Sequence, residues 1–202
     1  MSLVDWLIEP PILDRGATVP TKQDVLEKTR PIVAVIGLAP GAGTTTLARG
    51  IAATLARRDP SGAAIVTGRH EPTSPLLSLP SAARLAARME SAQPLGRLCL
   101  TSSVPEGSEA PLVLDGAPTP AAHLTILLAP ADAEPALAEL AARTHNAQLT
   151  VVNGSDERWH KRAFLSLPQS RLGARLAQAG WEPPGALGKA IARLADSAEE
   201  AA

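Results

Sequence analysis

Residues 31–46 read PIVAVIGLAPGAGTTT, and this stretch decides the fold. It opens with a β-branched apolar run without polar alternation at 32–36, which is typical of a strand buried on both faces of a parallel sheet. Leucine and isoleucine then recur at four-residue spacing, which predicts an amphipathic helix over 44–58. A glycine-rich turn between a buried strand and a helix is the setting in which backbone N–H groups surround a phosphate. Gly41 and Gly43 allow the backbone of that turn to approach a ligand closely and to adopt positive φ.

The same strand-then-helix pattern recurs along the chain. Alternating strands and helices predict an α/β fold with a doubly wound, mainly parallel sheet between two layers of helices, a three-layer sandwich. We expect this domain to span 31–202. Further strands are expected at 63–66, 98–100, 111–115, 124–128 and 149–153, and helices at 81–91, around Leu137 and Leu140, and through the tail 171–202.

The composition and charge of the chain argue against several classes of function. The 202 residues are 45% hydrophobic and 19% charged with a formal net charge of -1, which is typical of a globular domain and gives no strong signal for nucleic acid. Aromatic residues make up only 2%, too few for base-stacking platforms. The single cysteine, Cys99, excludes an internal disulfide. No apolar run is long enough for a transmembrane segment, and Met1–Asp14 lacks the basic start of a secretory signal, so we expect a cytoplasmic protein.

The first thirty residues form a separate unit in the sequence. Trp6, Leu7 and Ile8 make a short apolar cluster, and Pro10 and Pro11 then exclude a continuing helix. We expect residues 1–30 to be an N-terminal arm that packs on the domain or on a partner.

The turn resembles the ParA/MinD group of P-loop ATPases, whose deviant Walker A motif has the form K-G-G-x-G-K-[ST]-[ST]. Residues 39–46 match the two later glycines and both hydroxyl residues of this motif. Ala39 stands in place of the signature lysine, and Thr44 stands in place of the Walker lysine. The likeness covers about 31–198, and an arm before such a domain is similar to the linker of members that localise pilus machinery.

The resemblance assigns roles to further residues. It implies that Asp115 is the Walker B aspartate and that Asn153 contacts the base of a nucleotide; from the residues alone, the alternatives are a strand-capping acid and a turn residue. Arg49 lies too far along the first helix for an easy phosphate contact, and the isolated His123 and His145 do not predict a metal site. The predicted nucleotide-binding residues are Gly41, Ala42, Gly43, Thr44, Thr45, Thr46 and Asn153, and the predicted Mg²⁺ ligands are Thr45 and Asp115.

The missing lysines predict impaired catalysis. A Walker lysine places positive charge where charge develops during phosphoryl transfer, and Thr44 brings none. The second strand is followed by Thr67, Gly68, Arg69 and His70, with no carboxylate to position water. ATP hydrolysis should therefore be very slow or absent, and no catalytic residue is assigned.

Three functions remain open on the sequence. The first is a degenerate ParA/MinD-like protein, a homodimer that binds ATP or ADP with Mg²⁺ weakly or not at all and serves as a localisation or scaffold partner, by resemblance in pilus or secretion machinery. The second is an active NTPase or small-molecule kinase in which Arg69 or His70 replaces the lysine. The third is an interaction module without a nucleotide.

Overall fold

The computed structural model describes residues 30–67, 98–101 and 110–202. Their strands form a seven-stranded sheet in the order β3-β2-β4-β1-β5-β6-β7, and every neighbouring pair is parallel. The doubly wound α/β class predicted from the sequence is therefore confirmed. The strands are β1 (Ile32–Gly37), β2 (Ala63–Thr67), β3 (Leu98–Thr101), β4 (Leu112–Asp115), β5 (Leu124–Pro130), β6 (Leu149–Asn153) and β7 (Leu165–Leu167).

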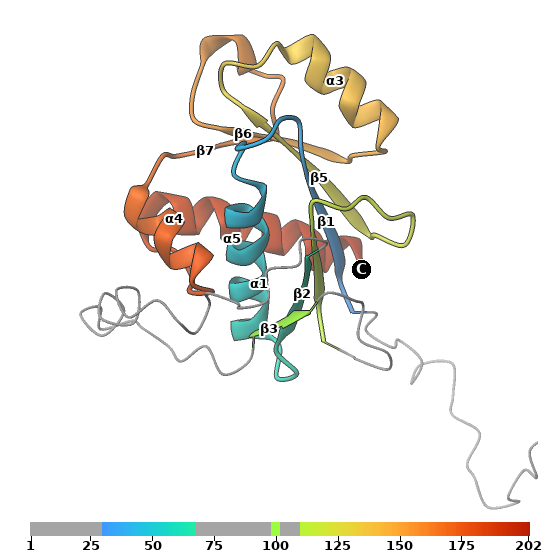
Figure 1. Ribbon diagram of the computed structural model, residues 1–202, viewed down its shortest axis with the longest axis vertical. Helices are drawn as coiled ribbons and strands as arrows, with labels where there is room; N and C mark the ends of the chain where they lie inside the picture. Colours follow the sequence, from blue (N-terminus) through green and yellow to red (C-terminus); the bar gives the residue numbers. More distant parts are fainter. Residues whose placement is uncertain (1–29, 68–97, 102–109) are drawn as a thin grey trace, which may run out of the picture.

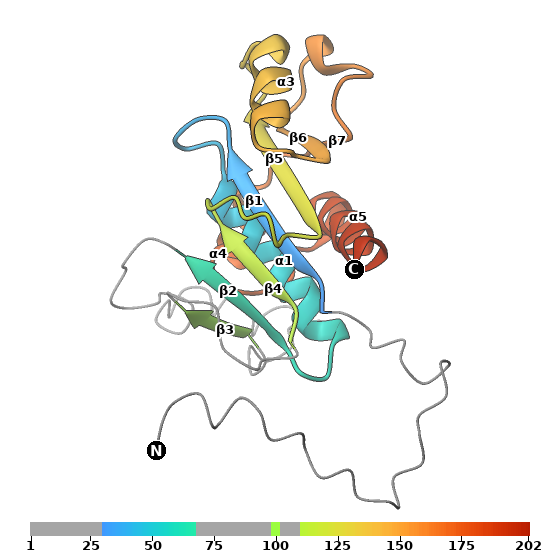
Figure 2. The ribbon, with the colours of Figure 1, turned by 90° about the vertical axis from the view of Figure 1, so that its right-hand side faces the viewer.

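Helices cover both faces of the sheet. Helix α1 (Thr44–Arg58) contacts both α4 (Arg171–Gln178) and α5 (Gly185–Ala201), and these three lie together in Figure 1, whereas α3 (Pro135–Thr144) lies beside β5 and β6. Successive residues of a strand point to opposite faces. Leu128 packs in the core with α1 and α5, and its neighbour Leu127 packs with Ala138 of α3. The chain is thus a three-layer sandwich, and Figure 2 shows the sheet from another side.

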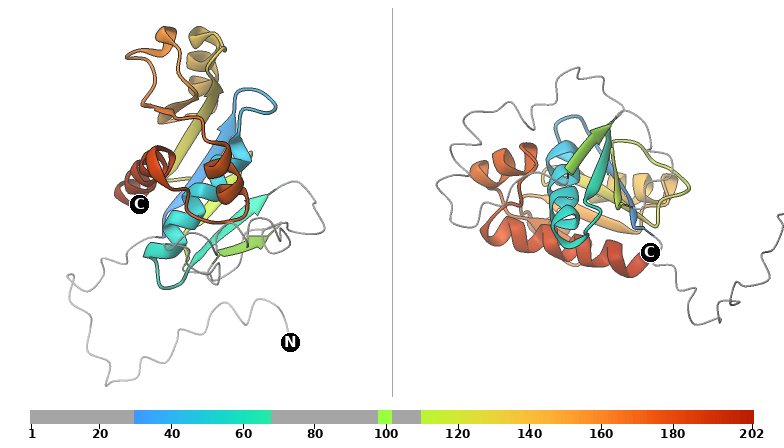
Figure 3. Two further views of the ribbon diagram at one scale, coloured as in Figure 1. Left: turned by 90° about the vertical axis from the view of Figure 1, so that its left-hand side faces the viewer. Right: turned by 90° about the horizontal axis from the view of Figure 1, so that it is seen from below.

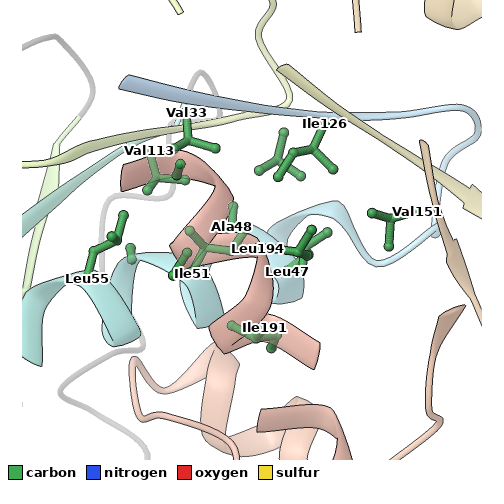
Figure 4. Close-up of a cluster of buried hydrophobic side chains, with 14 of the residues drawn as sticks. Val33, Leu47, Ala48, Ile51, Leu55, Val113, Ile126, Val151, Ile191 and Leu194 are labelled. Atoms are coloured by element: carbon green, nitrogen blue, oxygen red, sulfur yellow. The ribbon is translucent and has the colours of Figure 1, made fainter. Parts of the chain in front are cut away.

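The larger core lies between the sheet and the pair α1 and α5. The apolar stripe predicted for the first helix, Leu47, Ile51 and Leu55, is at most 1% exposed. Ile191 and Leu194 of α5 meet it (Figure 4). Burial of each such side chain contributes roughly 1.5–3 kcal/mol, so this packing holds α1 and the turn before it against the sheet.

The tail differs from the single helical segment that the sequence predicted over 171–202. Helix α4 ends where the N–H groups of Gly180 and Trp181 donate to the carbonyls of Ala177 and Leu176. Gly180 has φ of 80°, a left-handed conformation that glycine adopts without strain. Two prolines follow at 183 and 184, so a new helix, α5, starts at Gly185.

The order of the strands determines where in the sheet a ligand site is expected. Strand β1 lies between β4 and β5, and the chain leaves it to build β2, β3 and β4 on one side before β5, β6 and β7 on the other. In such sheets ligands bind beyond the carboxyl ends of the strands, at the point where the order reverses. That point carries the glycine-rich turn.

Candidate functional site: the glycine-rich loop after β1

The loop after β1 is fixed to the sheet at its start and closed on itself at its end. The N–H of Leu38 donates to the carbonyl of Leu128 at 2.9 Å, and the N–H of Ala42 donates to the carbonyl of Ala39 at 3.2 Å. Gly43 then has φ of 100° immediately before α1 begins at Thr44. The helix start predicted from the sequence is thereby confirmed, and the loop reaches it through a conformation that favours glycine.

The amide groups at the start of α1 have no acceptor within the part of the chain that the structure describes. The N–H groups of Gly43, Thr44 and Thr45 donate to no described group, and no side chain caps the helix. The first turn also contains no acidic residue. Unpaired amides and the positive end of the helix dipole together favour an anion. Binding of a phosphate by these amides stays a prediction.

Thr44, at the position where the resemblance places the Walker lysine, carries a hydroxyl. The side chain of Thr44 lies directly against Gly37, where an added Cβ would overlap its Oγ1 atom. No charged residue occurs between Pro31 and Ala48. The loop thus has unpaired amides at the start of α1 and no charged side chain of its own.

Asn153 lies at this loop, although it is distant in sequence. Strand β6 is two strands away from β1, and its last residue, Asn153, donates from Nδ2 to the carbonyl oxygen of Ala42 at 2.8 Å. The same nitrogen would be 3.0 Å from a Cβ added at Gly43. The structure therefore places Asn153 beside the predicted nucleotide-binding residues and uses one of its N–H groups to hold the loop. Base contact by Asn153 stays a prediction.

The two predicted Mg²⁺ ligands come from adjacent elements at the carboxyl edge of the sheet. Asp115 ends β4, is half-buried, and lies in register with Val35 of β1 and Thr67 of β2. Thr45 is half-buried in the first turn of α1. A carboxylate and a hydroxyl are hard oxygen donors of the kind that Mg²⁺ takes alongside phosphate oxygens. The donor set fits the ion, and its role in this chain stays a prediction.

The sequence did not predict a second side-chain hydrogen bond, which holds the first turn of α1. Gln178, at the end of α4, donates from Nε2 to Oγ1 of Thr46 at 3.2 Å and accepts a 2.6 Å hydrogen bond on its carbonyl from Arg49. Arg49 is only 6% exposed. Its charge therefore serves the carboxyl end of α4 rather than a phosphate, and no local pattern could reveal a contact across 129 residues.

Of the other residues that the sequence singled out, some lie within the described ranges and some lie outside them. Arg69 and His70 lie outside the described residues, as does the predicted helix 81–91. His123 accepts a hydrogen bond on Nδ1 from the N–H of Ile32 at 3.2 Å, which ties the start of β1 to the start of β5. Within the described ranges, no three histidine, cysteine or acidic residues cluster to hold a metal, and no helix is both long and apolar enough to cross a membrane.

Comparison with known proteins identifies the fold. No family model matches the sequence, and no curated protein matches it. Among solved structures, the chain is similar to a ParA family ATPase from Chlorobium tepidum TLS, with a TM-score of 0.54 and 10% identity over 83% of this chain and 98% of that one. The fold is therefore ParA-like.

Proposed function

We propose that this chain is a degenerate ParA-like protein that holds a nucleotide weakly, hydrolyses it very slowly or not at all, and acts as a localisation or scaffold partner for another protein. The observation that carries the proposal is the side chain of Thr44. It lies against Gly37 where the Walker lysine would leave the loop, and it supplies a hydroxyl without charge.

Weak binding follows from what the loop keeps and what it lacks. The unpaired amides of Gly43, Thr44 and Thr45 supply hydrogen bonds to a phosphate. A hydrogen bond from a charged donor contributes roughly 1.5–3 kcal/mol, and the loop has no such donor. We therefore expect ADP and ATP to bind, with an affinity about ten- to a hundredfold below that of a loop with its lysine.

Loss of hydrolysis follows from the same positions. Ala39 cannot extend a cation toward the phosphates, and Thr44 cannot stabilise the charge that develops on them. Catalysis of phosphoryl transfer consists mainly of such electrostatic stabilisation and positioning. A protein that retains the fold without these groups is suited to binding partners rather than to turnover.

The test is a titration with fluorescent ADP and ATP, with and without Mg²⁺, combined with a phosphate-release assay. The variant Thr44→Lys restores the charge, and Thr44→Met is the matched control because it has a long side chain without charge. Gly37 has no side chain, so a longer residue at Thr44 has a path past it.

We expect Thr44→Lys to tighten binding about tenfold or more, by the charged contact estimated above, and Thr44→Met to leave it unchanged. Removal of the Thr45 hydroxyl in Thr45→Ala should weaken the Mg²⁺-dependent part of binding. Rapid phosphate release by the wild-type chain would contradict the proposal, and so would equal binding by the lysine and methionine variants.

A further inference from the structure

Helix α3 places small side chains against the sheet and its two leucines on the outside. Pro135 and Ala138 are buried, and α3 packs on β5 and β6. Leu137 and Leu140 are 59% and 63% exposed, and their three-residue spacing makes them neighbours on the outer side of the helix. Figure 3 shows α3 at the periphery of the molecule. Two adjacent leucines are thus exposed on a helix whose inner side is already packed.

The composition of α3 is that of a helix that is covered on both sides. Seven of its ten residues are proline, alanine or leucine, and a helix that is apolar around its circumference is typical of burial. Its acid, Glu139, lies 3.4 Å from Arg162, whereas no ion pair among the described residues involves its base, Arg143. Arg143 follows Leu140 at i+3 and therefore lies on the same side. We call Leu137, Leu140 and Arg143 the α3 outer face.

The segment before β1 carries side chains that are complementary to the α3 outer face. Residues 1–29 lie outside the described part of the chain, and their sequence contains Trp6, Leu7 and Ile8 between Asp5 and Glu9. Tryptophan is among the residues most enriched at the centres of interfaces. The apolar run matches the two leucines of α3, and the acids match the charge of Arg143.

This segment joins the domain close to the place where α3 ends. The backbone N–H of Ile32 donates to His123, and its carbonyl accepts from the N–H of His123, so the start of β1 is fixed beside the start of β5. The chain that follows α3 returns to the same part of β5, where the N–H of Gln148 donates to the carbonyl of Thr125 at 3.0 Å. Residues 10–29 can span up to about 70 Å, whereas α3 is only about 15 Å long. The apolar run can therefore reach the α3 outer face of its own chain, and the covalent connection raises its local concentration there to the millimolar range.

We propose that residues 3–9 dock on the α3 outer face of the same chain, with Trp6 against Leu137 and Leu140 and with the acids facing Arg143. The sequence left open whether the arm packs on the domain or on a partner, and this inference names the surface. Docking of this kind opens locally without unfolding the domain, so it adds little to the free energy of unfolding. The surface includes no residue of the loop after β1, so the inference does not depend on nucleotide binding.

The test is fluorine NMR of the full chain labelled with fluorotryptophan. The chain contains three tryptophans, and the signal that disappears in Trp6→Phe belongs to Trp6. We expect this signal in the folded wild type to lie away from its position in the urea-denatured chain. Leu137→Ser/Leu140→Ser should lower the ratio of docked to free arm about tenfold or more and move the signal toward the denatured position. The matched control is Leu172→Ser, at a leucine of α4 that is 42% exposed, and it should leave the signal unchanged.

The converse experiment changes the arm and observes the domain. Leu7→Ser/Ile8→Ser should shift the amide signals of α3, because these side chains no longer cover it. Val25→Ser/Leu26→Ser makes the same chemical change elsewhere in residues 1–29 and should leave the α3 amides unchanged.

The charges give a separate measurement. Arg143→Glu should weaken docking a few-fold at low salt, and adding Asp5→Arg/Glu9→Arg to that chain should restore it, because each facing pair is again of opposite charge.

Four results would each overturn the proposal. They are a Trp6 signal at the denatured position in the wild type, a signal that ignores Leu137→Ser/Leu140→Ser, a signal that responds equally to Leu172→Ser, and docking that Arg143→Glu leaves unchanged. Dilution distinguishes the remaining occupants of the α3 outer face. The Trp6 signal should stay constant over a hundredfold range of protein concentration, whereas a signal that moves on dilution would mean that the arm of a second copy docks there and would also overturn the proposal.

Discussion

Replacing Asn153 with alanine removes a side-chain hydrogen bond that joins β6 to the loop. In the wild type, Nδ2 donates to the carbonyl of Ala42 at 2.8 Å, and Ala42 is only 3% exposed. The variant loses a net contribution of about 1 kcal/mol and leaves a buried carbonyl without this donor, which costs roughly 1–3 kcal/mol in total. We therefore expect the free energy of unfolding to fall by about 1–3 kcal/mol, and for a chain of this size each kcal/mol lowers the Tm by about 2–4 °C.

The assay is chemical denaturation of Asn153→Ala and Asn153→Asp, with Ser155→Ala as an exposed control from the following loop. Asn153→Asp should be at least as destabilising, because it replaces the donor with a carboxylate that faces the carbonyl oxygen. Titration with ADP and GDP then separates two roles. A residue that holds the loop should weaken both nucleotides alike, whereas a residue that reads the base should alter only the preference between them.

The reasoning would be refuted if Asn153→Ala changed the free energy of unfolding by no more than an ordinary surface substitution, about 0.5 kcal/mol. If Asn153→Ala lost the preference for ADP over GDP without a change in stability, Asn153 would instead contact the base, as the family resemblance implies.

Two further predictions concern the packing and the charge of the domain. Leu194→Ala empties a fully buried position between α5 and α1 and should cost about 2–5 kcal/mol, whereas Leu140→Ala, at a residue 63% exposed on α3, should stay within about 0.5 kcal/mol in the same denaturation assay. Similar costs for the two would contradict the core assignment. The side chain of Arg158 donates to Asp156 and holds the pKa of that carboxyl below its usual value. The stability that this pair adds is therefore present above the unfolded pKa of about 3.9 and is lost as the pH falls through the lower folded value. Carbon NMR of the Asp156 carboxyl should show this low titration, Arg158→Gln should raise it, and an ordinary pKa in the wild type would be the contrary result.

The sequence predicted the helices and strands whose burial leaves a clear pattern of apolar residues along the chain. The apolar run at 32–36 and the stripe of Leu47, Ile51 and Leu55 predicted β1 and α1 with bounds close to the observed ones. Burial on both faces of a strand leaves a continuous apolar run, and burial on one face of a helix leaves a periodic one. Strand β7 was missed as a strand, since three residues with one exposed serine carry no such pattern. Helix α3 buries Pro135 and Ala138 and exposes Leu137 and Leu140, so its leucines did not indicate the side that meets the sheet.

The sequence predicted where the candidate site lies in the sheet, but it did not predict the hydrogen bonds that its residues make. Strand ends at 37, 115 and 153 meet at one edge because the sheet is parallel, and parallel pairing was implied by the alternation of strands and helices. The hydrogen bonds of Asn153 to Ala42 and of Gln178 to Thr46 join residues more than a hundred positions apart. Such contacts depend on the packing of whole elements, and no local rule encodes them.

The most direct test of the loop as a phosphate site without its cation is an amide NMR titration of the wild-type chain with the Mg²⁺ complex of ADP. The account predicts weak, saturable shifts that are largest for the unpaired N–H groups of Gly43, Thr44 and Thr45. Shifts that avoid these three amides, or no shifts at any nucleotide concentration, would contradict it.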